Sequence, residues 1–226
     1  MFVGYYLTSN HTHFTLITDE SLQLKRLYLA SKSPRRTEIL RNLGLTFTVI
    51  APDIDESVRP HEQSHEYVLR LCAEKALAGL HLIAAELAGN ELAHSVLIDN
   101  QYQFIVLAAD TSVCINDQIL GKPDNSKHAI SMLHSLEGRS HLVHTGVAVA
   151  IDGQIHKTIS TTRVWMKSLT DFEIEAYVSS GESMDKAGGY GIQGLGGAFI
   201  SRIDGSYTGV MGLPVYETTK LLNGLF

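Results

Sequence analysis

The feature that most constrains the fold is the uninterrupted apolar run Phe104–Ala109, which leads into Asp110 and Thr111. A strand exposed on one face alternates apolar and polar residues, whereas a run that is apolar at every position is typical of a strand buried on both faces. A carboxyl group at the end of such a strand is costly unless it is paired, liganded or part of a site. Asp110 is therefore the first candidate catalytic residue, and a carboxylate that caps a turn is the structural alternative.

A strand followed by a helix is predicted near the start of the chain. Leu27–Ala30 is a short apolar strand, Ser33 stands at the N-cap position, and Pro34 occupies the first helical position, where its missing N–H costs nothing. Gly44 supplies the left-handed residue that ends the helix. The free N–H groups and hydroxyls of the first turn, together with Arg35–Arg36, suit an anion of phosphate size. The alternative is an ordinary capped helix with solvated arginines.

Proline, glycine and capping residues predict where the other elements begin and end. The expected strands cover residues 46–50, 113–115, 118–120, 141–150, 155–166, 198–203 and 207–211. The first expected helix covers residues 64–87, and a second is capped by Asn125 or Ser126 and ends at Gly138. A third opens with the capping box Thr170–Glu173 and ends at Gly181, and a closing helix begins at Pro214. Hairpin turns are expected at Asn116-Asp117, Asp152-Gly153 and Asp204-Gly205. This order predicts an α/β fold with a mixed twisted sheet and flanking helices.

The length of 226 residues suits one α/β domain or two small lobes. We assign residues 26–226 to a single domain and residues 1–25 to an N-terminal extension of unknown role, loosely docked or disordered. Polar residues 88–103 are expected to form an unusually long connection.

Charge and composition exclude several classes of protein. A formal net charge of −6 argues against a broad nucleic-acid-binding face. No run approaches the roughly 18 apolar residues of a membrane span, and the N-terminus lacks the features of a signal peptide, so we expect no membrane partner and a cytoplasmic location. Cys72 and Cys114 are expected to be reduced, buried thiols, although a disulfide between them stays open.

Two further polar stretches accompany Asp110. Lys122 lies on the rigid loop Gly121–Pro123, and the glycine-rich stretch Asp185–Gly197 permits close backbone approach to a ligand or forms a flexible structural loop. Basic side chains suit a polyphosphate, and an acid among them can deprotonate a water or hold a divalent cation. The sequence has no Walker motif, zinc-binding spacing or acyl-transfer elbow, and most of the 11 histidines are expected on the surface or in loops.

Together these motifs resemble the Maf family of nucleoside triphosphate pyrophosphatases. The matching segments are Leu29–Arg36, Ala108–Thr111, Gly121–Pro123 and Asp185–Gly194. The resemblance implies a Maf/inosine-triphosphatase-like fold with two lobes around a central cleft. It also implies hydrolysis of a nucleoside triphosphate between the α and β phosphates, with Mg²⁺ or Mn²⁺ as the divalent metal cation.

The resemblance assigns roles residue by residue. Asp110 matches the general base, and three residues match positions that select the substrate: Arg35, Thr111 and Gln193. These three fit the subgroup that acts on dTTP and UTP. Four residues match polar positions of the pocket: Ser33, Glu56, Lys75 and Lys122. Asp110 and Glu56 are the candidate metal ligands. Lys75 gains a role only if its face of the predicted helix turns inward.

Two other functions stay open at this stage. One is a nucleotide-binding regulator of septum formation with little turnover, and the other is a 7-methyl-GTP pyrophosphatase. The resemblance also suggests removal of modified nucleotides, a link to cell-division arrest, and a homodimer. The extension and the 88–103 insertion exceed the compact family pattern but touch none of the motifs.

Overall fold

The computed structural model describes residues 25–88 and 103–225, so the expected N-terminal extension and the 88–103 connection lie almost wholly outside the described residues. In these ranges seven strands form one mixed sheet in the order β2-β1-β3-β5-β6-β7, with β4 paired to β3. β1 is parallel to β2 and β3, and the other pairs are antiparallel. The strands are β1 (Lys25–Ala30), β2 (Thr48–Ile50), β3 (Gln103–Ile115), β4 (Gln118–Leu120), β5 (Ser140–Ile151), β6 (Gln154–Met166) and β7 (Ile200–Asp204). The predicted mixed α/β sheet is confirmed.

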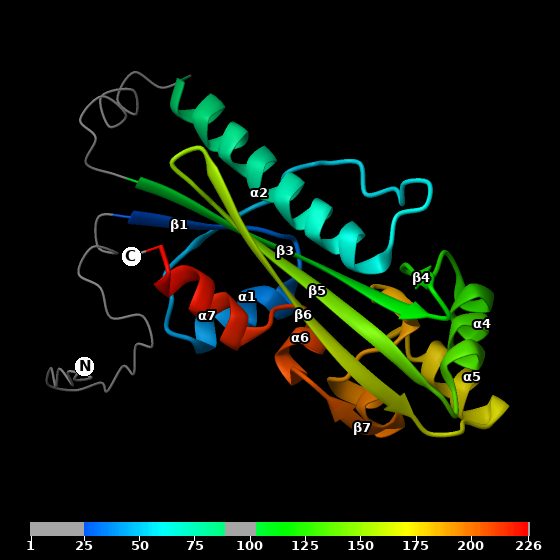
Figure 1. The fold of residues 1–226 in the computed structure, drawn as a ribbon. Helices are drawn as coiled ribbons and strands as arrows, with labels where there is room; N and C mark the ends of the chain where they lie inside the picture. The colour runs from blue at the N-terminus through cyan, green and yellow to red at the C-terminus, as the bar shows by residue number, and fades with distance from the viewer. Residues whose placement is uncertain (1–24, 89–102, 226) are drawn as a thin grey trace, which may run out of the picture.

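The helices cover both faces of this sheet (Figure 1). They are α1 (Pro34–Asn42), α2 (Ser64–Ala88), α4 (Ser126–Leu136), α5 (Asp171–Ser179), α6 (Tyr207–Met211) and α7 (Val215–Asn223), with 3₁₀ segments η2 (Ala187–Gly189) and η3 (Gly194–Phe199). The long helix α2 crosses one face, α1, α6 and α7 lie on the other, and α4 and α5 lie at the far end of the β5–β6 hairpin. No helix among the described residues has the length and apolarity required to cross a membrane.

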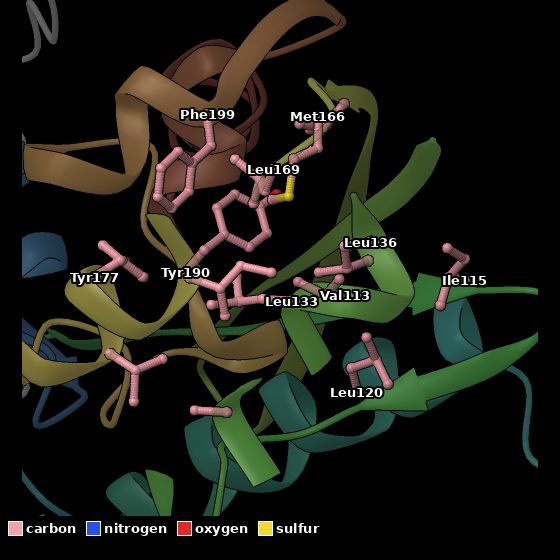
Figure 2. Close-up of a cluster of buried hydrophobic side chains, with 14 of the residues drawn as sticks. Val113, Ile115, Leu120, Leu133, Leu136, Met166, Leu169, Tyr177, Tyr190 and Phe199 are labelled. Carbon is pink, nitrogen blue, oxygen red and sulfur yellow. The ribbon is translucent and has the colours of Figure 1, made fainter. Parts of the chain in front are cut away.

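The run Phe104–Ala109 is buried from both sides, as predicted. Val106 and Ala108 belong to the cluster under α2, whereas Ile105 and Leu107 belong to the cluster under α1 and α7, and all four are fully buried. A third cluster lies at the far end, where α4 and α5 pack on the ends of β3, β5 and β6. Figure 2 shows this third cluster.

The contact between α2 and the sheet depends on glycine. A Cβ atom built on Gly146 of β5 would lie 2.5 Å from the carbonyl oxygen of Val68, and one on Gly79 of α2 would lie 2.8 Å from Cγ1 of Val106. Neither glycine has a positive φ, so space rather than conformation requires them. The missing side chains let α2 lie directly on β3 and β5.

Most boundaries that rest on local chemistry are confirmed. Asn125 caps α4 by accepting from the His128 N–H, Thr170 and Glu173 form a complete capping box, and Gly44 ends α1 with φ of 74°. Ser33 occupies the predicted N-cap position, but its side chain makes no capping hydrogen bond. The thiols of both cysteines are free and buried.

Four element predictions differ from the structure. Residues 207–211 form helix α6 instead of a strand, because the Ser206 hydroxyl accepts from the Gly209 N–H and caps a helix directly after the turn. The expected strand 198–203 begins only at Ile200, since η3 occupies residues 194–199, and the expected strand 46–50 begins only at Thr48. Finally, β3 does not end at Asp110 but continues to Ile115.

Candidate active site

The centre of the site is an ion-pair group formed by two carboxylates and one ammonium. Lys75 extends from α2, and its Nζ lies 2.6 Å from Oδ1 of Asp110 and 2.8 Å from Oε1 of Glu56. Asp110 is 7% exposed, and its side chain on β3 is flanked by the helix that carries Lys75. Lys75 therefore faces inward, which is the condition that its sequence-based role required.

Asp110 has no strand beside it on one edge, because its parallel neighbour β1 stops short. The last β1–β3 pair is Leu29 with Leu107, and after Ala30 the chain turns away into α1. On the other side β5 continues, pairing Gly146 with Asp110. Beyond the end of β1, Asp110 therefore borders a cavity rather than another strand.

This cavity has a volume of about 540 Å³ and brings together all the predicted motifs. Its lining comes from segments 30–36, 51–53, 110–113, 119–122, 185–187, 190–193 and 210–212, with Glu56, Tyr67, Lys75 and Val143. The eight residues singled out from the sequence all contribute to it: Ser33, Arg35, Glu56, Lys75, Asp110, Thr111, Lys122 and Gln193. The Gly188 N–H donates to the Gly121 carbonyl at 2.9 Å, so the loop of Lys122 and the glycine-rich loop are directly joined.

Burial and charge set the protonation of the two carboxyl groups. Burial raises the pKa of Asp110 above its ordinary 3.8, and the positive charges of Lys75 and Arg36 offset only part of this effect. Partial burial acts upward on the pKa of Glu56 as well, but the hydrogen bond and charge of Lys75 outweigh it and the net pKa is lowered. The site thus holds one carboxylate that takes up a proton more readily than usual and one that stays ionised.

The structure separates the two adjacent arginines, which the sequence grouped as one anion site. Arg36 is buried, and its guanidinium donates to the Gly212 carbonyl at 2.7 Å, to the Ser31 hydroxyl at 3.1 Å and to the Thr111 hydroxyl at 3.2 Å. The expectation that Arg36 is free to bind phosphate is therefore corrected, because Arg36 is a structural cation close to Asp110. Arg35 instead reaches the cavity, where its Nη1 lies 2.9 Å from Oδ2 of Asp185.

The hydroxyl of Thr111 both accepts and donates a hydrogen bond within the protein. Thr145 donates its hydroxyl hydrogen to the Gly209 carbonyl at 2.8 Å, so at the 3.0 Å contact between the two threonines Thr111 must be the donor. With Arg36 donating to it, Thr111 links the buried guanidinium to β5 and α6. Thr111 therefore shapes the cavity wall while its polar hydrogen points away from a ligand.

Other predicted residues are available for a ligand. The side chains of Ser33, Lys122 and Gln193 line the cavity, and none of them makes a hydrogen bond within residues 25–88 and 103–225. The positive charge of Lys122 contributes to lowering the pKa of Glu56, so the lysine acts on the same region of the site.

Several residues of the site were missed from the sequence. Tyr67 donates its hydroxyl to the Glu56 carbonyl at 2.9 Å and lines the cavity, and burial raises its pKa to about 12. Tyr177 and Glu182 hold the glycine-rich loop by bonds to its backbone. No periodicity distinguished these residues. The only available signal was the position of Glu182 directly after Gly181, the predicted end of a helix.

Two histidines are exceptions to the expectation that most of them lie on the surface or in loops. His141 and His144 are buried in β5, 2% and 8% exposed. Nε2 of His141 lies 2.6 Å from the Tyr190 hydroxyl, and burial lowers the pKa of His141 to about 4, so the ring is neutral.

The donor set suits a hard cation bound mainly through a ligand. Within the described parts of the chain no group of three or more His, Cys, Asp or Glu side chains converges. Asp110 and Glu56 nevertheless flank one point, held there by Lys75. One or two carboxylates together with phosphate oxygens are the usual ligands of Mg²⁺ in nucleotide sites.

Comparison with known proteins agrees with this geometry. The family described as Maf-like protein matches residues 26–225. A dTTP/UTP pyrophosphatase of Methylobacillus flagellatus is 49% identical over 201 residues, which cover 89% of this chain and 93% of that protein. A dTTP/UTP pyrophosphatase of Chromobacterium violaceum is 50% identical over 87% of this chain and 93% of that protein. A nucleoside triphosphate pyrophosphatase of Haemophilus ducreyi is 44% identical over 88% of this chain and 94% of that protein. The chain therefore belongs to the Maf family.

Proposed function

We propose that this protein is a nucleoside triphosphate pyrophosphatase that hydrolyses dTTP and UTP to the monophosphate and pyrophosphate. The observation that carries this proposal is the buried Asp110, paired with Lys75 beside a cavity lined by basic side chains. The relatives named dTTP/UTP pyrophosphatase, at 45–50% identity, support the choice of substrates.

Asp110 acts as the general base. Its carboxylate takes a proton from a water whose oxygen attacks the α-phosphorus, and the bond from that phosphorus to the α–β bridging oxygen breaks as pyrophosphate leaves. The raised pKa of Asp110 favours this transfer, because a base works best when its pKa is closer to the working pH. Lys122 and the N–H groups at the start of α1 hold the phosphates and stabilise the charge that develops on them.

A divalent cation, Mg²⁺ or Mn²⁺, would be held by Asp110 and Glu56 together with the phosphates. When bound, it offsets the charge of the triphosphate. Lys75 keeps the two carboxylates at a common point.

Selection of the nucleotide base is assigned to Arg35 and Gln193, which line the cavity from the start of α1 and from the glycine-rich loop. Thr111 contributes to this selection through the shape of the cavity wall that it forms with Arg36. In this proposal residues 26–226 are one domain. Its cavity is the cleft between a lobe formed by β1, β2 and α1 and a lobe formed by α4, α5 and the glycine-rich loop.

The test is pyrophosphate release by the purified protein from dTTP, UTP, CTP, GTP and 7-methyl-GTP, with Mg²⁺ and with Mn²⁺. We expect turnover of dTTP and UTP. Saturable binding without turnover of any substrate would instead support the regulator of septum formation, and preferred turnover of 7-methyl-GTP would move the chain to the other subgroup.

The Asp110→Asn variant tests the base. It should lose about 10²- to 10⁴-fold in turnover, the range for general-base catalysis, while it still binds nucleotide. Asp204→Asn is the matched control, because Asp204 is an exposed carboxylate on β7. Release of pyrophosphate by Asp110→Asn at the wild-type rate would remove Asp110 from the mechanism.

A further inference from the structure

The glycine-rich loop is held at both ends by two side chains that come from α5 and the turn after it. The Gly191 N–H donates to the hydroxyl of Tyr177 at 3.2 Å. The N–H groups of Leu195 and Gly196 donate to the carboxylate of Glu182 at 2.9 and 3.0 Å. Tyr177 donates its own hydroxyl hydrogen to Oε1 of Glu182 at 3.1 Å, which joins the two anchors.

The backbone between these anchors closes into a tight loop. A Cβ atom on Gly196 would lie 2.5 Å from the carbonyl oxygen of Gly191, so the two ends of the segment are in direct backbone contact. Gly194 has φ of 75°, and a Cβ atom there would lie 2.6 Å from Oε2 of Glu182. The loop is thus wrapped around the carboxylate, and Gln193 lies between its two ends.

Packing holds one anchor in place and hydrogen bonds hold the other. Tyr177 is 3% exposed and packs against Phe199 in the cluster of Figure 2, with ring centroids 5.0 Å apart. Burial acts to raise the pKa of Glu182, but the Gly196 and Leu195 N–H groups outweigh it and the pKa is lowered, so the carboxylate stays ionised and keeps accepting. Gln193, in contrast, lines the cavity without a hydrogen-bond partner among the described residues.

We propose that Tyr177 and Glu182 are positioning residues that determine base selectivity by holding segment 191–196 so that the Gln193 amide enters the cavity at a fixed place. The proposal rests on the proposed function. An amide distinguishes base edges only through directional hydrogen bonds, which weaken when the donor or acceptor moves by about half an ångström. A loop with this glycine content would sample many conformations without its anchors, and the amide would lose that precision.

The experiment compares Tyr177→Phe, Glu182→Gln and Gln193→Ala with the two double variants that combine each anchor substitution with Gln193→Ala. The ratio of kcat/KM for dTTP to that for CTP is measured for each. Tyr177→Phe keeps the ring in the cluster and removes only the hydroxyl, whereas Glu182→Gln removes one of the two acceptor oxygens.

Each anchor substitution should lower the ratio of kcat/KM for dTTP to that for CTP by about three- to tenfold, which is the effect expected when one hydrogen bond to the nucleotide base is lost. Adding either substitution to Gln193→Ala should change the ratio no further, because the anchors act through Gln193. The loss should appear mainly as a higher KM for dTTP, with a smaller change in kcat, since the anchors lie outside the Asp110 ion pair.

Glu137→Gln is the matched control, because Glu137 also accepts a backbone N–H, that of Leu169 at 2.9 Å, and does not line the cavity. The proposal is wrong if both anchor variants keep the wild-type ratio. It is also wrong if they reduce the ratio equally with and without Gln193, or if they only lower Tm. Ratios of Kd for dTTP and CTP in an Asp110→Asn background give the same test without turnover, so failure of the proposed function does not conceal the result.

Discussion

Replacement of Gly146 by alanine tests the link between the packing of α2 and the geometry of the site. The added Cβ atom would lie 2.5 Å from the Val68 carbonyl oxygen, about 0.9 Å inside the 3.4 Å at which ordinary van der Waals contact begins. It would also lie 3.1 Å from Sγ of Cys72. Because the first contact is with backbone, the clash is relieved only by moving α2 away from β5.

The displacement determines two expected magnitudes. Overpacking of this kind costs about 1–3 kcal/mol, which lowers Tm by about 2–12 °C for a domain of this size. The same movement carries Lys75 away from Asp110, across a contact that is 2.6 Å in the native protein. A misplacement of about 1 Å in a catalytic group costs on the order of 10²-fold in rate, so kcat for dTTP should fall by about one to two orders of magnitude.

The assay combines thermal unfolding with steady-state pyrophosphate release. Gly224→Ala is the control, because Gly224 has an ordinary φ and a Cβ atom there meets nothing closer than 3.4 Å. Wild-type Tm and wild-type kcat in Gly146→Ala would refute the reasoning. A lowered Tm with unchanged kcat would show that the sheet holds Asp110 and Lys75 together independently of this helix contact.

Two further predictions concern charge. Lys75→Met removes the ion-pair partner that lowers the pKa of Asp110, so the acidic limb of the kcat/KM profile should move to higher pH; an unmoved limb would mean that another group titrates there. Glu62→Gln breaks the Arg70 ion pair that lowers the pKa of Glu62 from 4.5 to about 2. A carboxyl group whose pKa is lower in the folded state than in the unfolded state stabilises the fold at pH values above the unfolded pKa. The Tm of Glu62→Gln should therefore be lower than that of the wild type at pH 7. Calorimetry should show this difference shrinking as the pH falls from about 4.5 through about 2.

The correct sequence predictions rest on chemistry that acts over a few residues. Asn125 caps a helix and Asn116-Asp117 turns a hairpin because their bonds and dihedral angles involve only their immediate neighbours. The two-sided burial of Phe104–Ala109 was evident because an unbroken apolar run admits few other structures. The same local reasoning mistook residues 207–211 for a strand, since a turn that could begin a hairpin was used to begin α6.

The sequence alone determined the class of fold, most element boundaries, and, through several motifs in one order, the family and the residues that line its cavity. Tertiary structure decided what those residues do there. Lys75 turns inward to Asp110, and the Gln193 loop is held from α5. Arg36 is committed to buried hydrogen bonds, whereas Arg35 pairs with Asp185 at the cavity. These relations join side chains that are distant in the chain, such as Lys75 and Asp110. Local conformational preferences do not determine which distant side chains meet, so the contact between Lys75 and Asp110 follows only from the close packing of α2 on the sheet.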